Sequence, residues 1–289
     1  MSFVRRKLEL TFQLGKGTFG TDGYDTVTVT DHRVRCRIHE VIGPGMGRAN
    51  VSIYGLAPTL LNELASLNQA TEAVRFNRLI IKAGDEGSTL ATVFEGQISL
   101  SQLDMNASPD VGLNVMAFAG QLQNVTNPEP SSYPGGTDAA VILYNLAQKA
   151  GLFFENESDA SQILATPAFE GSYLEQIDKC VKDAGFERYV GRNFLAIWEK
   201  GKNRGGNIAV VSAATGMVGY PGYSTSNNGG GIFVRTIFNP QLSIGQRARV
   251  ESTLKAANGV WFVFNIQHEL DAEVPGGQWF TMFDGYNNG

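Results

Sequence analysis

A regular alternation of apolar and polar residues opens the chain and constrains its fold. Leu8, Leu10, Phe12 and Leu14 share one parity, and the residues between them are polar. A period of two predicts a β-strand with one buried face, because successive side chains of a strand point to opposite sides. Similar strand patterns follow along the first half of the chain, at 25–38, 51–56, 73–84, 89–104 and 111–122.

One helix is expected to interrupt these strands. Pro58 is placed for a first helical turn, where its missing N–H costs nothing. Leucines then recur near a spacing of 3.6, at 60, 61, 64 and 67. The first half is therefore predicted to form a single β barrel or sandwich that carries one helix.

A change of pattern follows this half. Residues 127–136 hold three prolines and no large aliphatic side chain, which is typical of a linker. Helices are predicted over 137–150, ending at Gly151, and from a Ser172/Glu175 capping box to Gly185. A hairpin is predicted over 187–201. This middle part is interpreted as a small α+β unit.

The last third returns to strands after a second flexible stretch at 219–231. Strand patterns occupy 232–238, 246–253, 260–270 and 278–286. Asn258-Gly259 signals a hairpin and Gly276-Gly277 a further turn. We therefore predict a mainly β protein with an α+β insert. Its domains are expected at 1–127, 128–205 and 206–289, with 206–225 as an alternative completion of the first domain.

Charge and cysteine content exclude several classes of protein. The net charge is -5, the pI is about 5.3, and no Lys/Arg-rich run is present, so a nucleic-acid footprint is not expected. No signal peptide or membrane-spanning run is recognised. Cys36 and Cys180 are far apart, which predicts two buried thiols in a protein made in a reducing cytoplasm.

A glycine-rich string is the most conspicuous short motif. Gly15, Gly17 and Gly20 form G-x-G-x-x-G, which is similar to the phosphate-covering loop of protein kinases. A strand pattern, not a helix, follows it, so a dinucleotide site is not expected. The other kinase motifs are missing from the sequence. The string is predicted to be a hairpin loop.

Catalytic or metal-binding groups do not gather in the sequence. His32 and His39 fit a polar strand face, and the third histidine, His268, lies far from them. The acidic residues Glu155, Glu157 and Asp159 are predicted to lie in a solvated loop. We therefore expect no catalytic residues, no cofactor and no metal site, and a protein that is not an enzyme.

The order of motifs in the last third resembles a known family. The string GMVGYPGY at 216–223 is followed by FNPQLSIGQRARVES at 238–252, WFVFNIQHELD at 261–271 and QWFTMFDG at 278–285. This order resembles the baseplate hub proteins of tailed bacteriophages, including the late-control D group. Segments 51–56 and 91–98, and the helix and hairpin of the middle unit, extend the resemblance over most of the chain.

The resemblance implies both a fold and a role. Hub proteins of this family carry two tube-type β barrels flanking a small α+β domain. A homotrimer would then present six barrels and join a sixfold tail tube, or distal tail ring, to a threefold central spike. DNA would only pass through the lumen, other baseplate proteins would be neighbours, and no membrane insertion is implied. The expected location is the virion tail baseplate, assembled in the host bacterial cytoplasm.

Interface residues follow from the loop and from the aromatic tail. We predict that the loop from Gly15 to Asp22 and the aromatic tail strands form interfaces with neighbouring proteins. The residues predicted to make these contacts are Gly15, Gly17, Phe19, Gly20, Trp261, Phe264, Trp279 and Phe280. One alternative is a host- or carbohydrate-binding β module of a tail tip, which needs solvent-facing Trp261 and Trp279 rings. Another is a peptidoglycan hydrolase, which needs a cleft with two opposed carboxylates.

Overall fold

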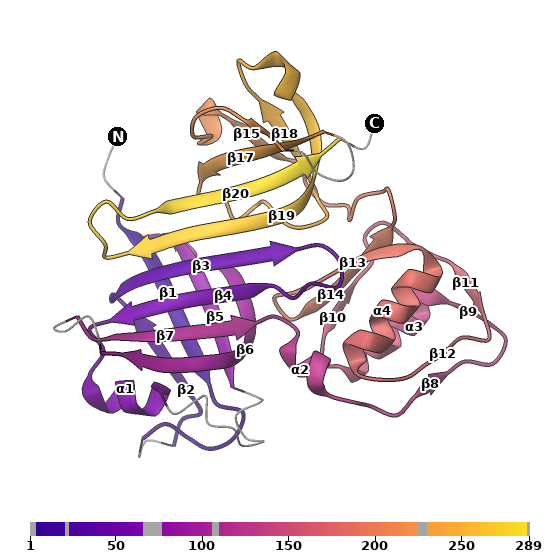
Figure 1. The fold of residues 1–289 in the computed structure, drawn as a ribbon, viewed down its shortest axis with the longest axis horizontal. Coiled ribbons are helices and arrows are strands. Elements are labelled where there is room, and N and C mark those ends of the chain that lie inside the picture. Colours follow the sequence, from indigo (N-terminus) through magenta and orange to yellow (C-terminus); the bar gives the residue numbers. More distant parts are fainter. Residues whose placement is uncertain (1–3, 21–22, 66–76, 106–109, 225–229, 288–289) are drawn as a thin grey trace. The chain divides into compact units, whose positions relative to one another are not determined.

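The computed structural model describes residues 4–20, 23–65, 77–105, 110–224 and 230–287 (Figure 1). The chain divides into two compact units. Unit 1 comprises Met1–His39, Gly47–Ala119 and His268–Phe280, and unit 2 comprises Glu40–Met46, Gly120–Gln267 and Thr281–Gly289. The domain boundaries expected at 127/128 and 205/206 stay a prediction.

Unit 1 is built on a β-sheet. Neighbouring strands of this sheet are antiparallel wherever their register is defined. The sheet order is β19-β3-β4-β7-β6-β5-β1-β2. The strands are β1 (Arg6–Gln13), β2 (Thr26–Thr30), β3 (Arg33–Val41), β4 (Arg48–Tyr54), β5 (Arg78–Asp85), β6 (Ala91–Asp104), β7 (Gly112–Phe118) and β19 (Gly259–Ala272). β3, β19 and β20 (Trp279–Tyr286) each contribute residues to both units.

The predicted alternation is confirmed in β1. Leu8, Leu10 and Phe12 are buried, while Lys7, Glu9 and Thr11 are only partly covered. Gly96 in β6 shows how closely the strands approach one another. A Cβ at Gly96 would lie 2.5 Å from the Phe118 carbonyl oxygen, so only glycine fits there.

Helix α1 (Pro58–Ala65) begins at the proline, as predicted. Leu64 is its buried residue, and the Leu64 carbonyl accepts a hydrogen bond from the Ser101 hydroxyl at 2.7 Å. Leu67, which completed the predicted leucine spacing, lies outside the described residues.

Unit 2 contains the helices and short strands of the middle sequence. The helices are α2 (Gln121–Val125), α3 (Ala139–Lys149) and α4 (Tyr173–Ala184). The short strands are β8 (Ser131–Ser132), β9 (Gly136–Asp138), β10 (Phe153–Glu155), β11 (Ile163–Ala165), β12 (Ala168–Phe169), β13 (Phe186–Gly191) and β14 (Phe194–Glu199). β10, β14 and β13 form a three-stranded sheet in which β10 runs parallel to β14.

The predicted helix signals of this part are largely confirmed. Ser172 and Glu175 form a reciprocal capping box at the start of α4, and Gly185 ends the helix with φ 70°. α3 begins two residues later than predicted, because the side chain of Asp138 accepts the Ala140 N–H and caps the helix. The segment predicted as a linker, 127–136, contains β8, which pairs with β12.

The rest of unit 2 is made of further β-strands. It contains β15 (Ala209–Ser212), β16 (Gly222–Ser224), β17 (Gly231–Ile237) and β18 (Arg247–Glu251) with parts of β19 and β20. β15 runs parallel to β18, and β18 antiparallel to β19. The stretch 219–231, predicted as flexible, holds β16, which pairs with β17, although 225–229 lie outside the described residues.

The Asn258-Gly259 turn was predicted incorrectly in one respect. β18 and β19 do form a hairpin, but residues 252–258 connect them and include a 3-10 turn at Lys255–Ala257. Gly259 already belongs to β19 and pairs with Val250. The Asn258 side chain accepts the Ser252 N–H at 2.6 Å and so closes the base of this longer loop.

Candidate interaction surfaces

The glycine-rich string is a hairpin loop between β1 and β2, as predicted. Leu14 donates its N–H to the Asp25 carbonyl, and Phe19 donates to the Tyr24 carbonyl, both at 2.8 Å. Gly17 and Gly20 have φ values of +90° and +53°, which glycine adopts without strain. The Gly15 N–H is bound by the Asn77 side chain at 3.0 Å. The role of the loop as an interface stays a prediction, and Thr21 and Asp22 lie outside the described residues.

The aromatic residues of the tail are not an exposed platform. Trp261 is 8% exposed in unit 2 and Trp279 is 2% exposed in unit 1. The Trp261 indole donates to the Ala257 carbonyl at 2.9 Å, and Arg6 lies 5.8 Å from the Trp279 ring centroid. A glycan platform needs solvent-facing rings, so this geometry does not favour the carbohydrate-binding alternative.

Phe264 and Phe280 are the two half-buried members of the predicted interface in the aromatic tail. The Phe264 ring centroid lies 5.5 Å from that of Tyr286, in unit 2. These two rings retain some surface for a partner, whereas the tryptophans serve the core. The part of either ring in an interface stays a prediction.

Histidine and cysteine side chains are placed as the sequence predicts. His32 and His39 are half-buried, and a His32 ring nitrogen lies 2.7 Å from the Thr30 carbonyl oxygen. Cys36 and Cys180 are free and buried. Burial raises the pKa of each thiol to about 12. Among the described residues, no group of three or more His, Cys, Asp or Glu side chains could hold a metal ion.

Glu155 corrects the prediction of a solvated acidic loop. It lies in β10 and forms a two-pronged ion pair with Arg204, whose side chain is 7% exposed. Arg204 also contacts the Ser243 hydroxyl at 3.0 Å, and its guanidinium carbon lies 4.7 Å from the Phe194 ring centroid. Only Glu157 and Asp159 of the predicted acidic loop are exposed. The sequence could not reveal this pair because its members are 49 residues apart.

A second buried polar contact pins the end of β3 within unit 2. The hydroxyl of Tyr189 donates a short hydrogen bond to Glu40, and each of these two residues is 1% exposed. Arg192 lies 3.9 Å from the other Glu40 oxygen. Burial, and then repulsion by Glu40, raises the pKa of Tyr189. This contact fixes the connection between β3 and β4.

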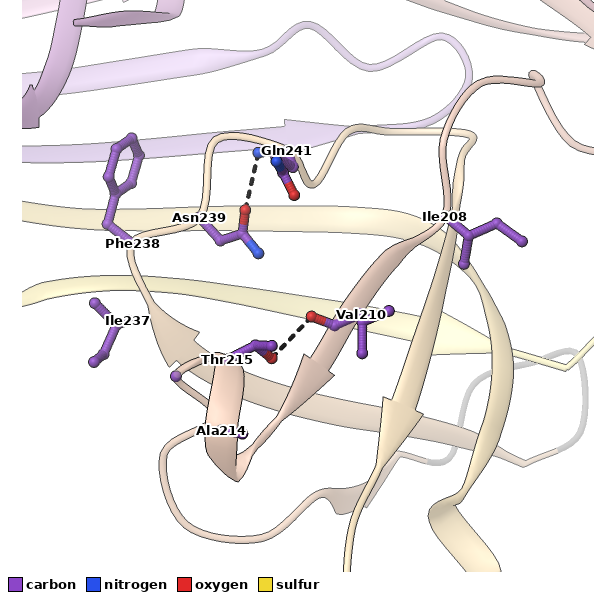
Figure 2. Close-up of a pocket in the computed structure, with 9 residues that line it drawn as sticks. Ile208, Val210, Ala214, Thr215, Ile237, Phe238, Asn239 and Gln241 are labelled. Atoms are coloured by element: carbon purple, nitrogen blue, oxygen red, sulfur yellow. Dashed lines mark hydrogen bonds between the residues drawn. The ribbon is translucent and has the colours of Figure 1, made fainter. Parts of the chain in front are cut away.

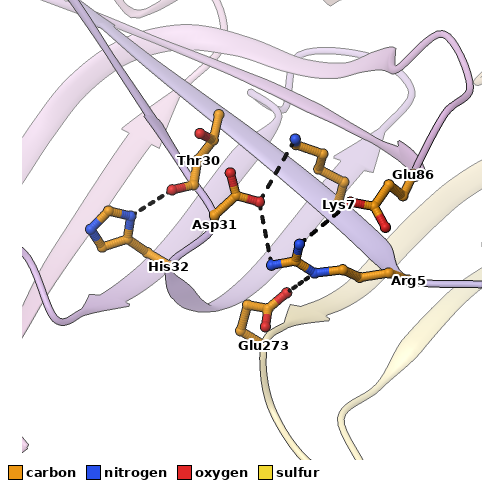
Figure 3. Close-up of polar contacts among 7 residues, drawn as sticks. All are labelled: Arg5, Lys7, Thr30, Asp31, His32, Glu86 and Glu273. Atoms are coloured by element: carbon orange, nitrogen blue, oxygen red, sulfur yellow. Dashed lines mark hydrogen bonds and ion pairs between the residues drawn. The ribbon is translucent and has the colours of Figure 1, made fainter.

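Exposed charges cluster at the start of β1 in unit 1 (Figure 3). The Arg5 guanidinium lies 2.7 Å from Glu273 and 3.4 Å from both Glu86 and Asp31. Lys7 reaches Asp31 at 3.7 Å. Hydrogen bonding and charge attraction from Glu273 raise the pKa of Arg5. The cluster ties the first strand to the turn between β19 and β20.

An apolar groove on unit 2 was not predicted from the sequence (Figure 2). It has a volume of about 670 Å³ and lies beside β15. Its apolar rim is formed by Ile208, Val210 and Ile237, which are 43%, 41% and 50% exposed. The sequence feature that indicates this groove is the run Ile208 to Val211, which contains no polar residue that could face the solvent.

Comparison with known proteins identifies the family. A profile of the baseplate hub gp41 family matches residues 7–274, so the chain belongs to this family of tail baseplate hubs and is a structural protein of a bacteriophage tail. No curated protein sequence matches the chain. Among the described residues, no helix is both long and apolar enough to cross a membrane.

Solved structures of tail proteins share the fold. A 43 kDa tail protein of prophage MuSo2 from Shewanella oneidensis is 9% identical, with a TM-score of 0.65 over 97% of each chain. A tail protein from Neisseria meningitidis MC58 is also 9% identical, with a TM-score of 0.63 over 96% of each chain. An E. coli component of the type VI secretion system, described as similar to the T4 tail proteins gp27 and gp5, is 10% identical. Its TM-score is 0.59 over 88% of this chain and 73% of that one.

Proposed function

We propose that the protein is a homotrimeric adaptor that joins the sixfold tail tube to the threefold central spike. The observation that carries the proposal is a likeness to tail proteins that runs through the whole chain, at 97% of both lengths for the Shewanella protein. Both units, and not one alone, therefore belong to the conserved architecture. Both units contain β-strands, so three chains would bring together six strand-containing units.

Symmetry gives the physical reason for this stoichiometry. A threefold ring needs heterologous contacts that close on rotation. If each unit closes into a tube-type barrel, six barrels in one ring would match six subunits of a tube on one side. The three chains would match three spike subunits on the other side. The net charge of -5 suits a lumen through which DNA passes without strong binding.

The proposed partners are the tail tube protein or a distal tail ring, the central spike protein and other baseplate proteins. We also propose that the protein is assembled in the host cytoplasm. The interface residues proposed for these contacts remain Gly15, Gly17, Phe19, Gly20, Trp261, Phe264, Trp279 and Phe280. Because both tryptophans are buried, Phe264 and Phe280 are the side chains to test first.

Native mass tests the stoichiometry. Light scattering after size exclusion should give 93.6 kDa, three times the 31.2 kDa of the monomer, across a concentration series. A mass of 31.2 kDa at every concentration contradicts the trimer. Mixing the protein with the tube and spike proteins of the same phage then tests the adaptor role. Electron microscopy of that mixture should show the hub between the two partners, and binding to neither partner contradicts it.

A further inference from the structure

β15 is a short edge strand without the charged residues or proline that often protect such an edge. It pairs with β18 on one side, and no strand in the described part of the chain pairs with its other side. Its sequence, Ala-Val-Val-Ser, has no proline and no charged residue. Natural edges are usually blocked by such residues, by bulges or by covering segments. An apolar, uncharged edge is therefore suited to pairing with another chain.

The backbone of β15 is open at one end only. Thr215 donates to the Val210 carbonyl at 2.9 Å (Figure 2). It also accepts the Ser212 N–H at 2.8 Å, so the turn after β15 satisfies these groups. Since the N–H and C=O of a strand residue point to the same side, the Val210 N–H faces the open edge. The open part of the edge is thus Ile208 to Val210, where the apolar groove lies.

Two arginines border this open part. Arg249 is the register partner of Val210 on β18, and Arg247 lies two residues earlier on the same face. Both are exposed, and within the described residues neither side chain forms an ion pair or a hydrogen bond. Glu251, the partner of Ser212, occupies the closed end of the edge. The positive charge is therefore confined to the end where backbone groups and apolar side chains are open.

The described edge strands of this chain do not offer a matching segment. β2 reads Thr-Val-Thr-Val-Thr and has no acidic residue. β16 reads Gly-Tyr-Ser and has none either. β10 contains Glu155, but its carboxylate is held by Arg204. β13 contains Glu187, which accepts the Trp198 indole N–H, and β9 contains Asp138, which caps α3. Charge complementarity to Arg247 and Arg249 therefore indicates a different protein, not a second copy.

We propose that the open edge of β15 docks an extended, acidic segment of another protein. The segment adds a strand beside β15, with apolar side chains on Ile208, Val210 and Ile237 and carboxylates toward Arg247 and Arg249. Adding a strand gains main-chain hydrogen bonds, while the groove and the charges select the sequence. The added strand lies about 10 Å from β18, two strand spacings, which long arginine and glutamate side chains span together. The site does not depend on the proposed trimer.

A designed peptide is the probe for this site. It has about ten residues, a length that covers one strand, with valine and glutamate alternating and a fluorescent label. The fluorescence anisotropy of the labelled peptide is measured as the full-length protein is added. It should show saturable, salt-sensitive binding with a Kd below about 1 mM. Hydrogen exchange should show new protection in residues 208–210, which form the open part of the edge. A peptide with lysine in place of glutamate should bind at least about tenfold more weakly, since like charges face each other.

Charge reversal tests the assignment. The double variant Arg247→Glu/Arg249→Glu should lose at least about tenfold in affinity for the glutamate peptide and gain affinity for the lysine peptide. The matched control Lys149→Glu/Lys200→Glu makes the same change in net charge at exposed positions away from the groove. It should leave binding within about twofold of the wild type.

Four results would overturn the proposal. These are no saturable binding of the glutamate peptide, equal loss in both double variants, new protection only outside residues 208–210, or a fall in native mass of the arginine variant. The last result would assign the edge to a contact between copies of this chain. Because peptide binding and native mass are measured separately, failure of this site is distinguishable from failure of the trimer.

Discussion

Arg204 and Glu155 form a two-pronged ion pair, with Arg204 Nη2 2.6 Å from Glu155 Oε2. The pair joins the loop after β14 to β10, and the bond from Arg204 Nη1 to the Ser243 hydroxyl brings in the loop before β18. Three segments that are distant in sequence thus meet at one guanidinium. This contact holds the small α+β part of unit 2 against the segment that leads into β18.

Replacing Arg204 should therefore destabilise the protein. In Arg204→Met the Glu155 carboxylate loses its partner, and breaking a buried pair costs about 3–5 kcal/mol. We expect about 3 kcal/mol, because the Glu155 side chain is 24% exposed and regains contact with water. Urea unfolding measures the change. The control Lys202→Ala breaks the more exposed pair with Glu199 and should cost less than about 1 kcal/mol. Equal effects of the two variants would contradict the assigned role.

Gly245 should tolerate no side chain. Its φ is +80°, and a Cβ would lie 2.7 Å from the Trp198 ring. In Gly245→Ala, left-handed backbone strain of about 1 kcal/mol adds to about 1–3 kcal/mol of overpacking. Gly151 has φ +71° and open space around its Cβ position, so Gly151→Ala should show the backbone strain alone. If the two variants unfold at the same urea concentration, the Trp198 contact is not tight.

Sequence patterns predicted the structure correctly where the interactions that determine it lie within a few residues. The β1 alternation and the Ser172/Glu175 capping box act within a few residues, and both are found as predicted. Glu155 was misjudged because its partner is 49 residues away, and nothing in its own neighbourhood indicates burial. The groove beside β15 also escaped prediction, since exposure of Ile208 and Val210 depends on which strands pair.

Tyr189 should contribute to stability through Glu40. In Tyr189→Phe the buried Glu40 carboxylate loses a hydrogen bond, which costs about 1–3 kcal/mol. Tyr220 is 74% exposed, so Tyr220→Phe should change stability by less than about 0.5 kcal/mol. A double-mutant cycle with Glu40→Gln isolates the contact. A coupling energy near zero would show that the hydroxyl and the carboxylate act independently.

Loss of the Ser172 hydroxyl should weaken α4 at its first turn. Ser172 Oγ accepts the Glu175 N–H at 3.2 Å, and the Glu175 carboxylate accepts the Ser172 N–H at 2.7 Å. Ser172→Ala removes the first of these bonds and should cost about 1 kcal/mol, whereas Ser172→Asp keeps an acceptor and should cost less. Chemical unfolding compares the two variants. If aspartate is no better than alanine, the hydroxyl contributes through packing and not as a cap.

The two thiols should make stability fall at high pH. Burial raises the pKa of Cys36 and of Cys180 from 9.0 to about 12. In the unfolded chain they lose their protons near pH 9, while in the folded protein they keep them. Their contribution is therefore complete below pH 9 and is lost as the pH rises from 9 to about 12. The slope is about 1.4 kcal/mol per pH unit for each thiol.

Urea unfolding from pH 8 to pH 10.5 measures this slope. Cys36→Ala and Cys180→Ala should each reduce the slope by the share of one thiol, and the double variant by both shares. Because Cys36 lies in unit 1 and Cys180 in unit 2, reaction with a thiol reagent at pH 8 also reports the opening of each unit. Both thiols should react slowly without urea. Rapid reaction of either thiol in the native protein, or an unchanged slope in the double variant, would show that it is not buried.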